Sequence, residues 1–458
     1  MGRNASTPPL LEPAHPGVLA LGRRDWLLLL LLTLFAFGLR AWRLDMPREQ
    51  YFDEIYYMKA AQDYLDGRED SNTVHPPLGK IQIAAGMLLA DRLDAWLGPG
   101  DDLPDTAEWR LTSLVAGTLM VPLTFLLAFR MSRGKGSLAA CAAFLVAVDF
   151  MALAISRIAM LDSVLSLWIL VGLYASWRYL EEAELGDPHR WTWATAAALA
   201  FGVATACKWN GLFAAFGACL VMVGFGAPSR LQPEAEPTGS GRERLLRWVG
   251  PPVLMALLIP LVYALSYGFL FYHEGTLGAV AWEKIYGFHK LMISFRSDPK
   301  QFSHRYLSYF WEWPLVLRPI WFYYQAEQGR VSGIVAFGSI LFWWTSLLYL
   351  FEVGVVAVTR RDRACTFLVV TWVCQWLLWA SSRTGGFIYY LLPGVPLLAV
   401  ATAMVLDEWQ ETGGRAVSLA YLAGVVVFFV AYFPFLTALP ATQHHFDVVF
   451  PVWAGRWR

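Results

Sequence analysis

Long apolar segments recur from one end of the chain to the other, and they restrict what it can fold into. An α-helix needs about 20 mostly apolar residues to cross a bilayer. Hydrophobic residues make up 57% of the 458 residues and charged residues only 16%, whereas soluble domains carry roughly 25% charged residues. The sequence therefore predicts an all-α polytopic membrane protein. About eleven spanning helices are expected, at 25–42, 109–129, 136–152, 161–180, 191–207, 210–227, 248–271, 331–358, 364–380, 386–406 and 416–439.

The basic residues between these segments predict how the chain is oriented. If the N-terminus is cytoplasmic, the short inner loops are rich in Arg and Lys, as the positive-inside rule requires. An odd number of spans then places the C-terminus outside. The inner-loop cations are Arg130, Arg133, Lys135, Arg178, Arg190, Arg230, Arg242, Arg244, Arg247, Arg360, Arg361 and Arg363.

The same assignment divides the chain into three parts. Residues 1–24 are expected to form a disordered cytoplasmic tail, 25–439 the membrane domain, and 440–458 an extracytoplasmic tail. Two outer loops, at about 43–108 and 272–330, are long and rich in aromatic residues. Loops beyond about 12–15 residues are usually functional or disordered, and the aromatic content favours function. Two interfacial helices are predicted in the first loop, because its apolar runs are too short or too charged to span.

Composition also limits the partners and cofactors. The 36 basic and 36 acidic side chains cancel, so no nucleic acid partner is indicated. No Gly-rich phosphate loop and no metal-binding cysteine pair occurs, and we expect neither a metal nor a cofactor. The five cysteines fall in or beside apolar runs and are expected to be packing residues.

Two adjacent carboxylates, Asp53 and Glu54, follow the first apolar segment and stand among the aromatic residues of 51–57. Neighbouring side chains point about 100° apart on a helix and to opposite faces on a strand. The two cannot address one atom equally, so one is expected to act as base or nucleophile while the other orients it or binds a hydroxyl. The alternative is an acidic pair that caps a helix, and spacing alone leaves both open.

A rigid segment follows at His75-Pro76-Pro77. Two prolines fix φ and favour an extended chain before a helix that begins near Lys80. His75 and Lys80 would then be presented near the membrane surface, as candidates for acceptor or sugar binding. A plain helix-entry turn with a Lys side chain that extends to the interface is the alternative.

Three ionisable residues, Arg157, Asp162 and Lys208, lie at predicted outer membrane edges. Ionisable groups at that depth are costly and usually face a cavity or a partner. Arg157 and Lys208 are candidate ligands of an anionic group, and Asp162 is a candidate sugar ligand. A structural salt bridge explains them equally well.

The second outer loop and the segment 381–390 supply further candidates. Arg318 stands within a dense aromatic run and Arg383 at an outer edge, so both could bind an anion. An ordinary interfacial aromatic belt is the alternative for the aromatic residues. The aromatic candidates for the sugar or acceptor are Trp311, Trp313 and Tyr389.

Taken together, these segments resemble the protein O-mannosyltransferase family in its bacterial, actinobacterial-like form. Eukaryotic members carry a large β-trefoil insert in the second long outer loop, for which this loop is too short. The matching segments, in chain order, are Phe52-Asp53-Glu54, 75–80, 157–163, 207–211, 311–314, 317–324 and 389–393.

The resemblance implies a GT-C-type glycosyltransferase of the plasma membrane with its active site on the extracytoplasmic face. The family moves mannose from polyprenyl-phosphate-mannose to Ser or Thr of secreted or membrane proteins, with inversion. Carried onto this chain, it implies Asp53 as general base and Glu54 as its positioning partner. Arg157 and Lys208 are implied at the donor phosphate, and His75 on the acceptor side. Membrane lipid and the protein translocation machinery are further partners to expect.

Two rival hypotheses remain at this stage. A related GT-C enzyme would glycosylate a lipid or cell-wall glycan instead of a protein. A transporter without chemistry would show inverted repeats and broken helices near mid-membrane, and the sequence shows charges at the outer edge instead.

Overall fold

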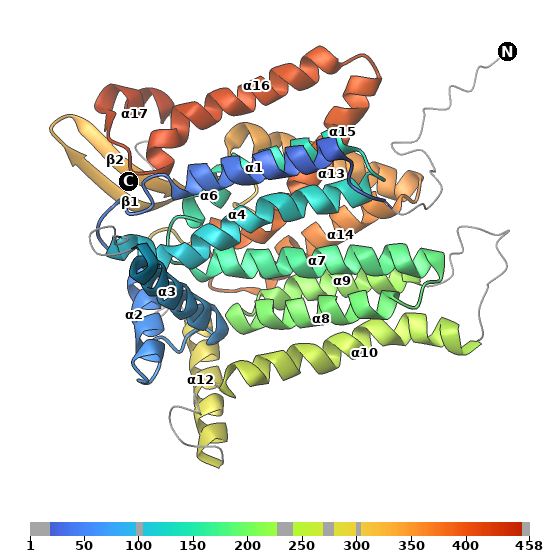
Figure 1. The fold of residues 1–458 in the computed structure, drawn as a ribbon, viewed down its shortest axis with the longest axis horizontal. Helices are drawn as coiled ribbons and strands as arrows, with labels where there is room; N and C mark the ends of the chain where they lie inside the picture. Colours follow the sequence, from blue (N-terminus) through green and yellow to red (C-terminus); the bar gives the residue numbers. More distant parts are fainter. Residues whose placement is uncertain (1–18, 98–103, 227–240, 269–278, 299–303, 451–458) are drawn as a thin grey trace.

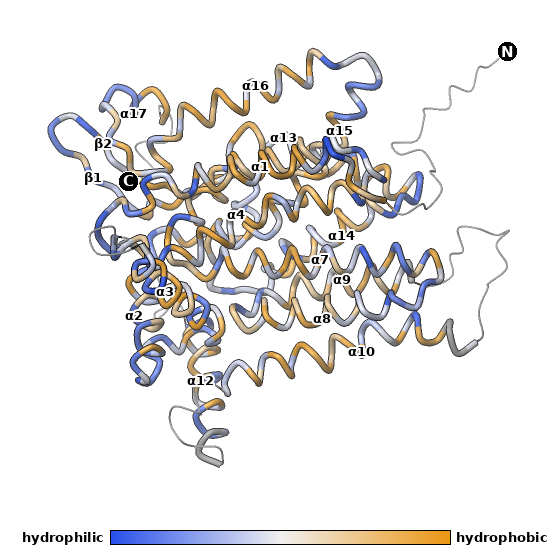
Figure 2. Tube along the Cα trace, viewed as in Figure 1, coloured by the Kyte–Doolittle hydropathy of each residue, from blue (hydrophilic) through white to orange (hydrophobic). Residues whose placement is uncertain are grey.

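The computed structural model describes residues 19–97, 104–226, 241–268, 279–298 and 304–450. Most of the predicted N-terminal tail lies outside them. Within the described residues the chain forms a bundle of long helices that run between two ends of the molecule (Figure 1). Figure 2 shows that these helices are largely apolar along their length, with hydrophilic residues gathered toward the two ends.

Each predicted span overlaps a helix, so the helical membrane-protein class is confirmed. Among the described residues, seven helical segments are long and apolar enough to span a membrane by themselves. The helices that overlap the predicted spans are α1 (Arg23–Ala41), α4 (Asp105–Met131), α5 (Gly136–Ala147), α7 (Leu161–Leu185), α8 (Arg190–Cys207), α9 (Gly211–Gly226), α10 (Gly241–Ser266), α13 (Ile340–Thr359), α14 (Arg363–Leu377), α15 (Val395–Glu411) and α16 (Arg415–Tyr432).

Short helices and a small sheet gather at one end, which we call the site end; the other is the far end (Figure 1). Helices in the first outer loop were predicted, and two occur there. The remaining helices among the described residues are α2 (Glu54–Leu65), α3 (Leu78–Leu97), α6 (Phe150–Ile155), α12 (Ala279–Ser297), α17 (Gln443–Val449) and the 3-10 helices η1 (Leu378–Ser381), η2 (Ile388–Gly394) and η3 (Phe433–Leu436).

The sheet was not predicted. Strands β1 (Ile320–Glu327), β2 (Arg330–Ala336) and β3 (Ala441–Thr442) pair antiparallel in that order. The turn Gln328-Gly329 has φ of 48° and 73°, the left-handed geometry that two-residue hairpins favour. Residues 331–336, at the start of the predicted helix 331–358, are therefore a strand. The prediction was wrong there because apolar β-branched residues can pack in a sheet as well as in a helix.

The chain end also differs from the expected tail. Residues 441–449 form β3 and α17, and Phe446 in α17 is buried against Trp321 of β1 and Phe435. Aromatic packing of this kind fixes a short helix that could not persist alone. The part from 451 onward lies outside the described residues.

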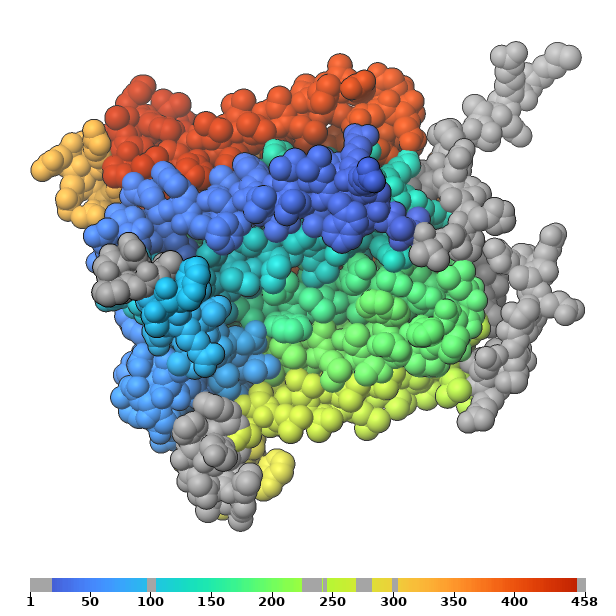
Figure 3. Space-filling model, in the orientation of Figure 1, coloured from blue at the N-terminus to red at the C-terminus, as the bar shows by residue number. Residues whose placement is uncertain are grey.

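Small residues explain how α8 is held between α7 and α10. A Cβ at Gly172 of α7 would lie 2.7 Å from the Phe201 ring, and one at Gly202 would lie 2.8 Å from Val262 of α10. In lipid, helices associate through such close approach of small residues. The α7–α10 group forms one continuous part of the surface, green to yellow in Figure 3. These approaches fix the half of α8 that leads to Lys208 at the site end, and Arg190 begins the helix at the far end.

Candidate active site

Asp53 lies where the chain turns from the first outer loop into α2. It is the N-cap residue of that helix, and its carbonyl accepts hydrogen bonds from the backbone N–H groups of Tyr56 and Tyr57. Its side chain is half-buried, and the Tyr389 hydroxyl donates to Oδ2 at 3.4 Å. The helix start thus fixes the backbone while one carboxylate oxygen remains available for another partner.

The surroundings of Asp53 make it more basic than an ordinary aspartate. The pKa of Asp53 is raised to about 6, chiefly by burial; the Asp162 carboxylate also raises it, whereas Lys208 and the Tyr389 hydrogen bond lower it. A base works best when its pKa lies near the working pH. Asp53 therefore has the basicity of a general base near neutral pH.

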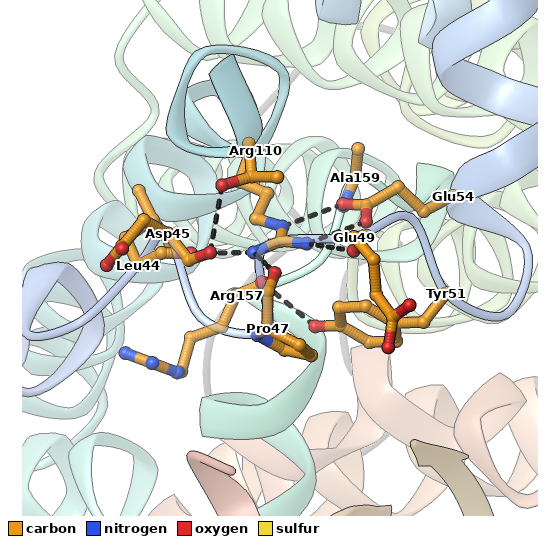
Figure 4. Close-up of polar contacts among 10 residues, drawn as sticks. Leu44, Asp45, Pro47, Glu49, Tyr51, Glu54, Arg110, Arg157 and Ala159 are labelled. Atoms are coloured by element: carbon orange, nitrogen blue, oxygen red, sulfur yellow. Dashed lines mark hydrogen bonds and ion pairs between the residues drawn. The ribbon is translucent and has the colours of Figure 1, made fainter. Parts of the chain in front are cut away.

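Glu54, the next residue, lies in a closed structural network (Figure 4). Its two carboxylate oxygens each accept a hydrogen bond from Arg110 at 2.9 Å, and the Ala159 N–H donates to Oε1 at 3.0 Å. Both side chains have no exposed surface. Arg110 also donates to the carbonyls of Leu44 and Pro47. Glu54 thereby ties α2 to α4 and to the segment before α7, and it can position Asp53 only through the backbone.

Arg157 is engaged by the same scaffold. Its Nη1 donates to the carbonyls of Leu39, Arg40 and Trp42, and its Nη2 donates to that of Arg43 at 2.8 Å. The guanidinium points away from Arg110 and toward the end of α1 (Figure 4). These contacts satisfy the carbonyls at a helix C-terminus. They give Arg157 a structural role, in place of the phosphate contact that the sequence suggested.

Lys208 and Asp162 meet although 46 positions separate them in the chain. Lys208 Nζ donates to both carboxylate oxygens of Asp162, at 3.0 and 2.8 Å. Lys208 caps α8 in an extended conformation, and a Cβ at Gly211 would lie 2.6 Å from Thr205 N. Glycine is therefore needed for the tight α8–α9 turn. The turn holds Lys208 at the site end, with its ammonium 5.4 Å from the centre of the Tyr389 ring.

His75 and Lys80 have different surroundings. Lys80 is fully buried, pairs with Asp70 and donates to the carbonyls of Asn72 and His75. It fixes the loop instead of facing a cavity. Burial lowers the pKa of His75 well below its usual value, as do the charges of Lys208 and Lys80. His75 is therefore neutral and can donate or accept a hydrogen bond.

A small cavity brings His75 and Lys208 together with Arg296 of α12. Arg296 Nη1 donates to the Tyr390 hydroxyl at 3.1 Å, and its guanidinium lies 5.2 Å from the Trp379 ring centre. The sequence analysis missed Arg296. Its signal in the sequence is a cation near the middle of the second outer loop, where the local pattern does not distinguish it from the other basic residues of that loop.

A groove of about 840 Å³ continues from this cavity along α9 and α10. Arg296 and Arg383 lie in its lining together with His289, and several serines lie beside them. Apolar residues line another part, among them Leu212, Phe213, Ile259 and Pro260. The groove therefore offers cations at one part and hydrocarbon contact at another, as a lipid with an anionic head requires.

The remaining candidates of the second outer loop lie apart from this cavity. Arg318 is exposed and engages Glu312 and the Leu307 carbonyl. Trp311 is half-exposed and lines an apolar groove between α13 and α14. Trp313 is buried and packs 5.7 Å from the rings of both Trp379 and Tyr390. Trp313 supports the cavity wall, whereas Arg318 and Trp311 do not line the cavity.

The comparison with protein families agrees with this arrangement. Residues 30–231 match the model of dolichyl-phosphate-mannose-protein mannosyltransferase, and residues 281–453 match that of the C-terminal four-helix membrane region of protein-O-mannosyltransferase. The chain belongs to the protein O-mannosyltransferase family. It is a membrane glycosyltransferase that transfers mannose to proteins, as the resemblance predicted.

Individual relatives cover almost the whole chain. The polyprenol-phosphate-mannose–protein mannosyltransferase of Mycobacterium tuberculosis H37Rv is 26% identical over 95% of this chain and 92% of its own length. That of Mycolicibacterium smegmatis mc(2)155 is also 26% identical, over 100% of this chain and 98% of its own. The match to bacterial relatives fits the short second outer loop.

Solved structures confirm the GT-C fold. The Saccharomyces cerevisiae Pmt1-Pmt2 complex bound to the sugar donor superposes with a TM-score of 0.78 at 15% identity, over 96% of this chain and 93% of that one. ArnT from Cupriavidus metallidurans bound to undecaprenyl phosphate gives a TM-score of 0.57 at 13% identity, over 95% and 72%. At these identities the likeness concerns the fold and not the individual site residues.

Proposed function

We propose that this protein O-mannosyltransferase takes mannose from polyprenyl-phosphate-mannose and transfers it, with inversion, to Ser or Thr of secreted or membrane proteins. The observation that carries the proposal is the half-buried carboxylate of Asp53, with a raised pKa, which accepts a hydrogen bond from Tyr389. The Tyr389 ring lies 5.4 Å from the ammonium of Lys208, which lines a cavity together with Arg296. A base and phosphate-binding cations are the two requirements of this reaction.

The reaction follows from these groups. Asp53 removes the proton from the acceptor hydroxyl as its oxygen attacks the anomeric carbon. The bond from that carbon to the phosphate oxygen breaks, and the electron pair leaves with the polyprenyl phosphate. Lys208 and Arg296 stabilise the charge that develops on the phosphate. One displacement inverts the anomeric carbon, so no covalent sugar–enzyme intermediate is formed.

Other side chains assist without taking part in bond changes. Asp162 holds the Lys208 ammonium from one side, and Glu54 with Arg110 fixes the start of α2. His75, neutral in the cavity wall, is assigned to a hydroxyl of the sugar or acceptor. Tyr389 donates to Asp53 in the resting state and is assigned to the sugar side.

The donor's polyprenyl chain is assigned to the groove along α9 and α10. Its apolar lining suits an isoprenoid chain, and Arg383 with Arg296 would meet the phosphate at its polar part. This assignment makes Arg383 a ligand of the donor phosphate, as the sequence suggested. It also makes Arg296 a phosphate ligand in place of Arg157.

The proposed location is the plasma membrane, with the site end extracytoplasmic. The basic inner-loop residues that the sequence analysis grouped favour this orientation. Acceptors would then meet the site as they leave the protein translocation machinery, which is a partner we propose on that basis alone. Cysteine labelling from outside intact cells, at positions introduced at the Gln328-Gly329 turn, tests the orientation; protection there would reverse it.

The acceptor is tested by a competition. Purified protein is given polyprenyl-phosphate-mannose with a Ser/Thr peptide, a glycolipid acceptor, or both. Transfer to the peptide with inverted anomeric configuration is expected. Transfer to the glycolipid alone would favour the second candidate, a GT-C enzyme that acts on a lipid or cell-wall glycan.

A further inference from the structure

A cluster of cationic and polar side chains lies at the far end, remote from the catalytic site. Arg190 begins α8, whose other end carries Lys208. A helix of this length spans roughly 27 Å at 1.5 Å per residue, close to the hydrocarbon thickness of a bilayer. The cluster therefore lies at the level of the opposite membrane interface, where headgroups of the other leaflet are found.

Three side chains of the cluster have buried polar atoms without a partner among the described residues. They are Arg190 with Nε and Nη1, Tyr179 with its hydroxyl, and Arg247 with Nε. Arg190 is only 5% exposed and Tyr179 is fully buried. A buried donor that lacks a partner costs roughly 1–3 kcal/mol, and more when it is charged. Such a group indicates a ligand that accepts hydrogen bonds.

The three residues come from three helices, and α8 packs against both α7 and α10. Tyr179 of α7 lies within electrostatic range of both guanidiniums. Its ring is 6.1 Å from that of Trp191, and a Cβ at Gly250 of α10 would lie 2.3 Å from the same indole. Trp191 thus joins α7, α8 and α10 and fixes the cluster between them.

Among the side chains that the structure describes, the carboxylates at the end of α7 and just after it each pair with another cation. Arg178 holds Glu182, while Arg130 and Arg178 hold Glu181. Glu184 pairs with Arg363, and Asp187 with His189. Within the described part of the chain, the cluster of Tyr179, Arg190 and Arg247 therefore keeps its positive charge for an external anion.

The adjoining surface favours a lipid over a soluble anion. Arg247 stands between Leu246 and Trp248, which are 42% and 53% exposed, and the exposed residues Val253 and Leu257 follow along α10. An exposed apolar helix face next to buried cations suits acyl chains below an anionic headgroup. Trp248 is also of the type that anchors helices at membrane interfaces.

We propose that Tyr179, Arg190 and Arg247 form a binding site for the phosphate of an anionic phospholipid in the leaflet opposite the active site. Arg presents a planar fork of donors that matches phosphate oxygens, and the Tyr179 hydroxyl supplies a third donor. The lipid would hold α7, α8 and α10 together at the far end. It is a structural ligand and separate from the sugar donor.

The test uses the full chain in detergent, with thermal unfolding followed during titration with phosphatidylglycerol, phosphatidylcholine or inorganic phosphate. Phosphatidylglycerol should raise the unfolding midpoint of the wild type. The double variant R190Q/R247Q should need more than about tenfold as much of it, as expected for the loss of two charged contacts. The matched control is R415Q, which removes an exposed arginine from the start of α16 and should respond as the wild type does.

Three results would overturn the proposal. The first is an equal phosphatidylglycerol response in R190Q/R247Q and wild type, and the second is an equal loss in R415Q. The third is the same Arg-dependent stabilisation by inorganic phosphate alone, which would indicate a soluble anion. If the double variant fails to fold, R190K replaces it, because lysine keeps the charge and loses the planar fork of donors. R190K should need about threefold more phosphatidylglycerol than the wild type for the same rise in the unfolding midpoint. An unchanged requirement would contradict the site.

Discussion

Asp53 and Glu54 are neighbours in the chain, yet the structure places them in regions of opposite character. Glu54 faces a dry scaffold in which Arg110 and a backbone N–H satisfy its oxygens. Asp53 lies beside Tyr389 at the site end, and the hydrogen bond that it accepts from the Tyr389 hydroxyl is long at 3.4 Å. The same functional group therefore has complete partners at Glu54, whereas at Asp53 it has room for another partner, and on this difference the proposed base rests.

The cations divide in the same way. Arg110 and Arg157 donate to carbonyls of the segment 39–49 and hold the loop that carries Asp53. Lys208 and Arg296 line the cavity instead. Buried charge by itself does not indicate catalysis, because a charge saturated by backbone carbonyls cannot bind a substrate.

The largest expected effect separates the two carboxylates by activity. Substitution D53N removes the proton acceptor and should reduce transfer to a Ser/Thr peptide by about 10²–10⁴-fold. The unfolding midpoint should stay close to that of the wild type, since Asp53 makes one long side-chain hydrogen bond. Turnover and thermal unfolding of the same preparation check this. Transfer within a few-fold of wild type would remove Asp53 from the reaction.

The second effect concerns stability. Substitution E54Q or R110Q leaves one buried charge without its partner, and breaking a buried pair costs about 3–5 kcal/mol. The double variant E54L/R110M removes both charges and should recover part of that loss. Unfolding in denaturing detergent measures the three variants. A single variant as stable as wild type would show that the scaffold does not depend on this pair.

The third effect compares two arginines after α10. Substitution R296Q should lower kcat/KM by roughly 10–100-fold, because a charged hydrogen bond contributes about 1.5–3 kcal/mol. Substitution R318Q, at an exposed residue that bonds its own loop, serves as the matched control and should change kcat/KM by less than about threefold. Equal losses would mean that the cavity does not hold the donor phosphate.

The fourth effect is on the pH dependence. Burial raises the pKa of Asp53 to about 6, and the base acts in its deprotonated form. The value of kcat/KM should therefore rise with pH up to about 6 and level off above it, falling about tenfold per unit well below the pKa. Measuring kcat/KM between about pH 4.5 and pH 8 checks this. That range extends from just above the ordinary carboxylate pKa of about 4 to beyond the ordinary histidine pKa of about 6.5. A kcat/KM that stays constant below about pH 6 would contradict the raised pKa of Asp53.

The sequence predicted the fold class well, because long apolar segments admit few alternatives. The prediction was wrong at residues 331–336, which were assigned to a spanning helix because they are apolar and precede one. They form strand β2, whose partner strand β1 lies in the second outer loop. The sequence also made Asp53, Glu54, His75 and Lys208 candidate site residues, and their roles in the reaction stay predictions. Periodicity could not reveal their partners, which are distant in the chain.

The roles within the site depended on those distant partners. Arg110 begins a spanning segment, where a charged residue is common at the interface, and so it gave little signal. Its bidentate contact with Glu54 spans 56 positions, and the Lys208–Asp162 pair spans 46. Only the folded chain separates the scaffold cations from those that line the cavity.

The proposed mechanism requires Asp53 to face an anomeric carbon whose phosphate is held by Lys208 and Arg296. A cryo-electron microscopy structure of the D53N variant with polyprenyl-phosphate-mannose bound would show this arrangement. We expect the phosphate in contact with Lys208 and Arg296, and the mannose between it and residue 53. A phosphate bound at Arg157, or a sugar turned away from residue 53, would contradict it.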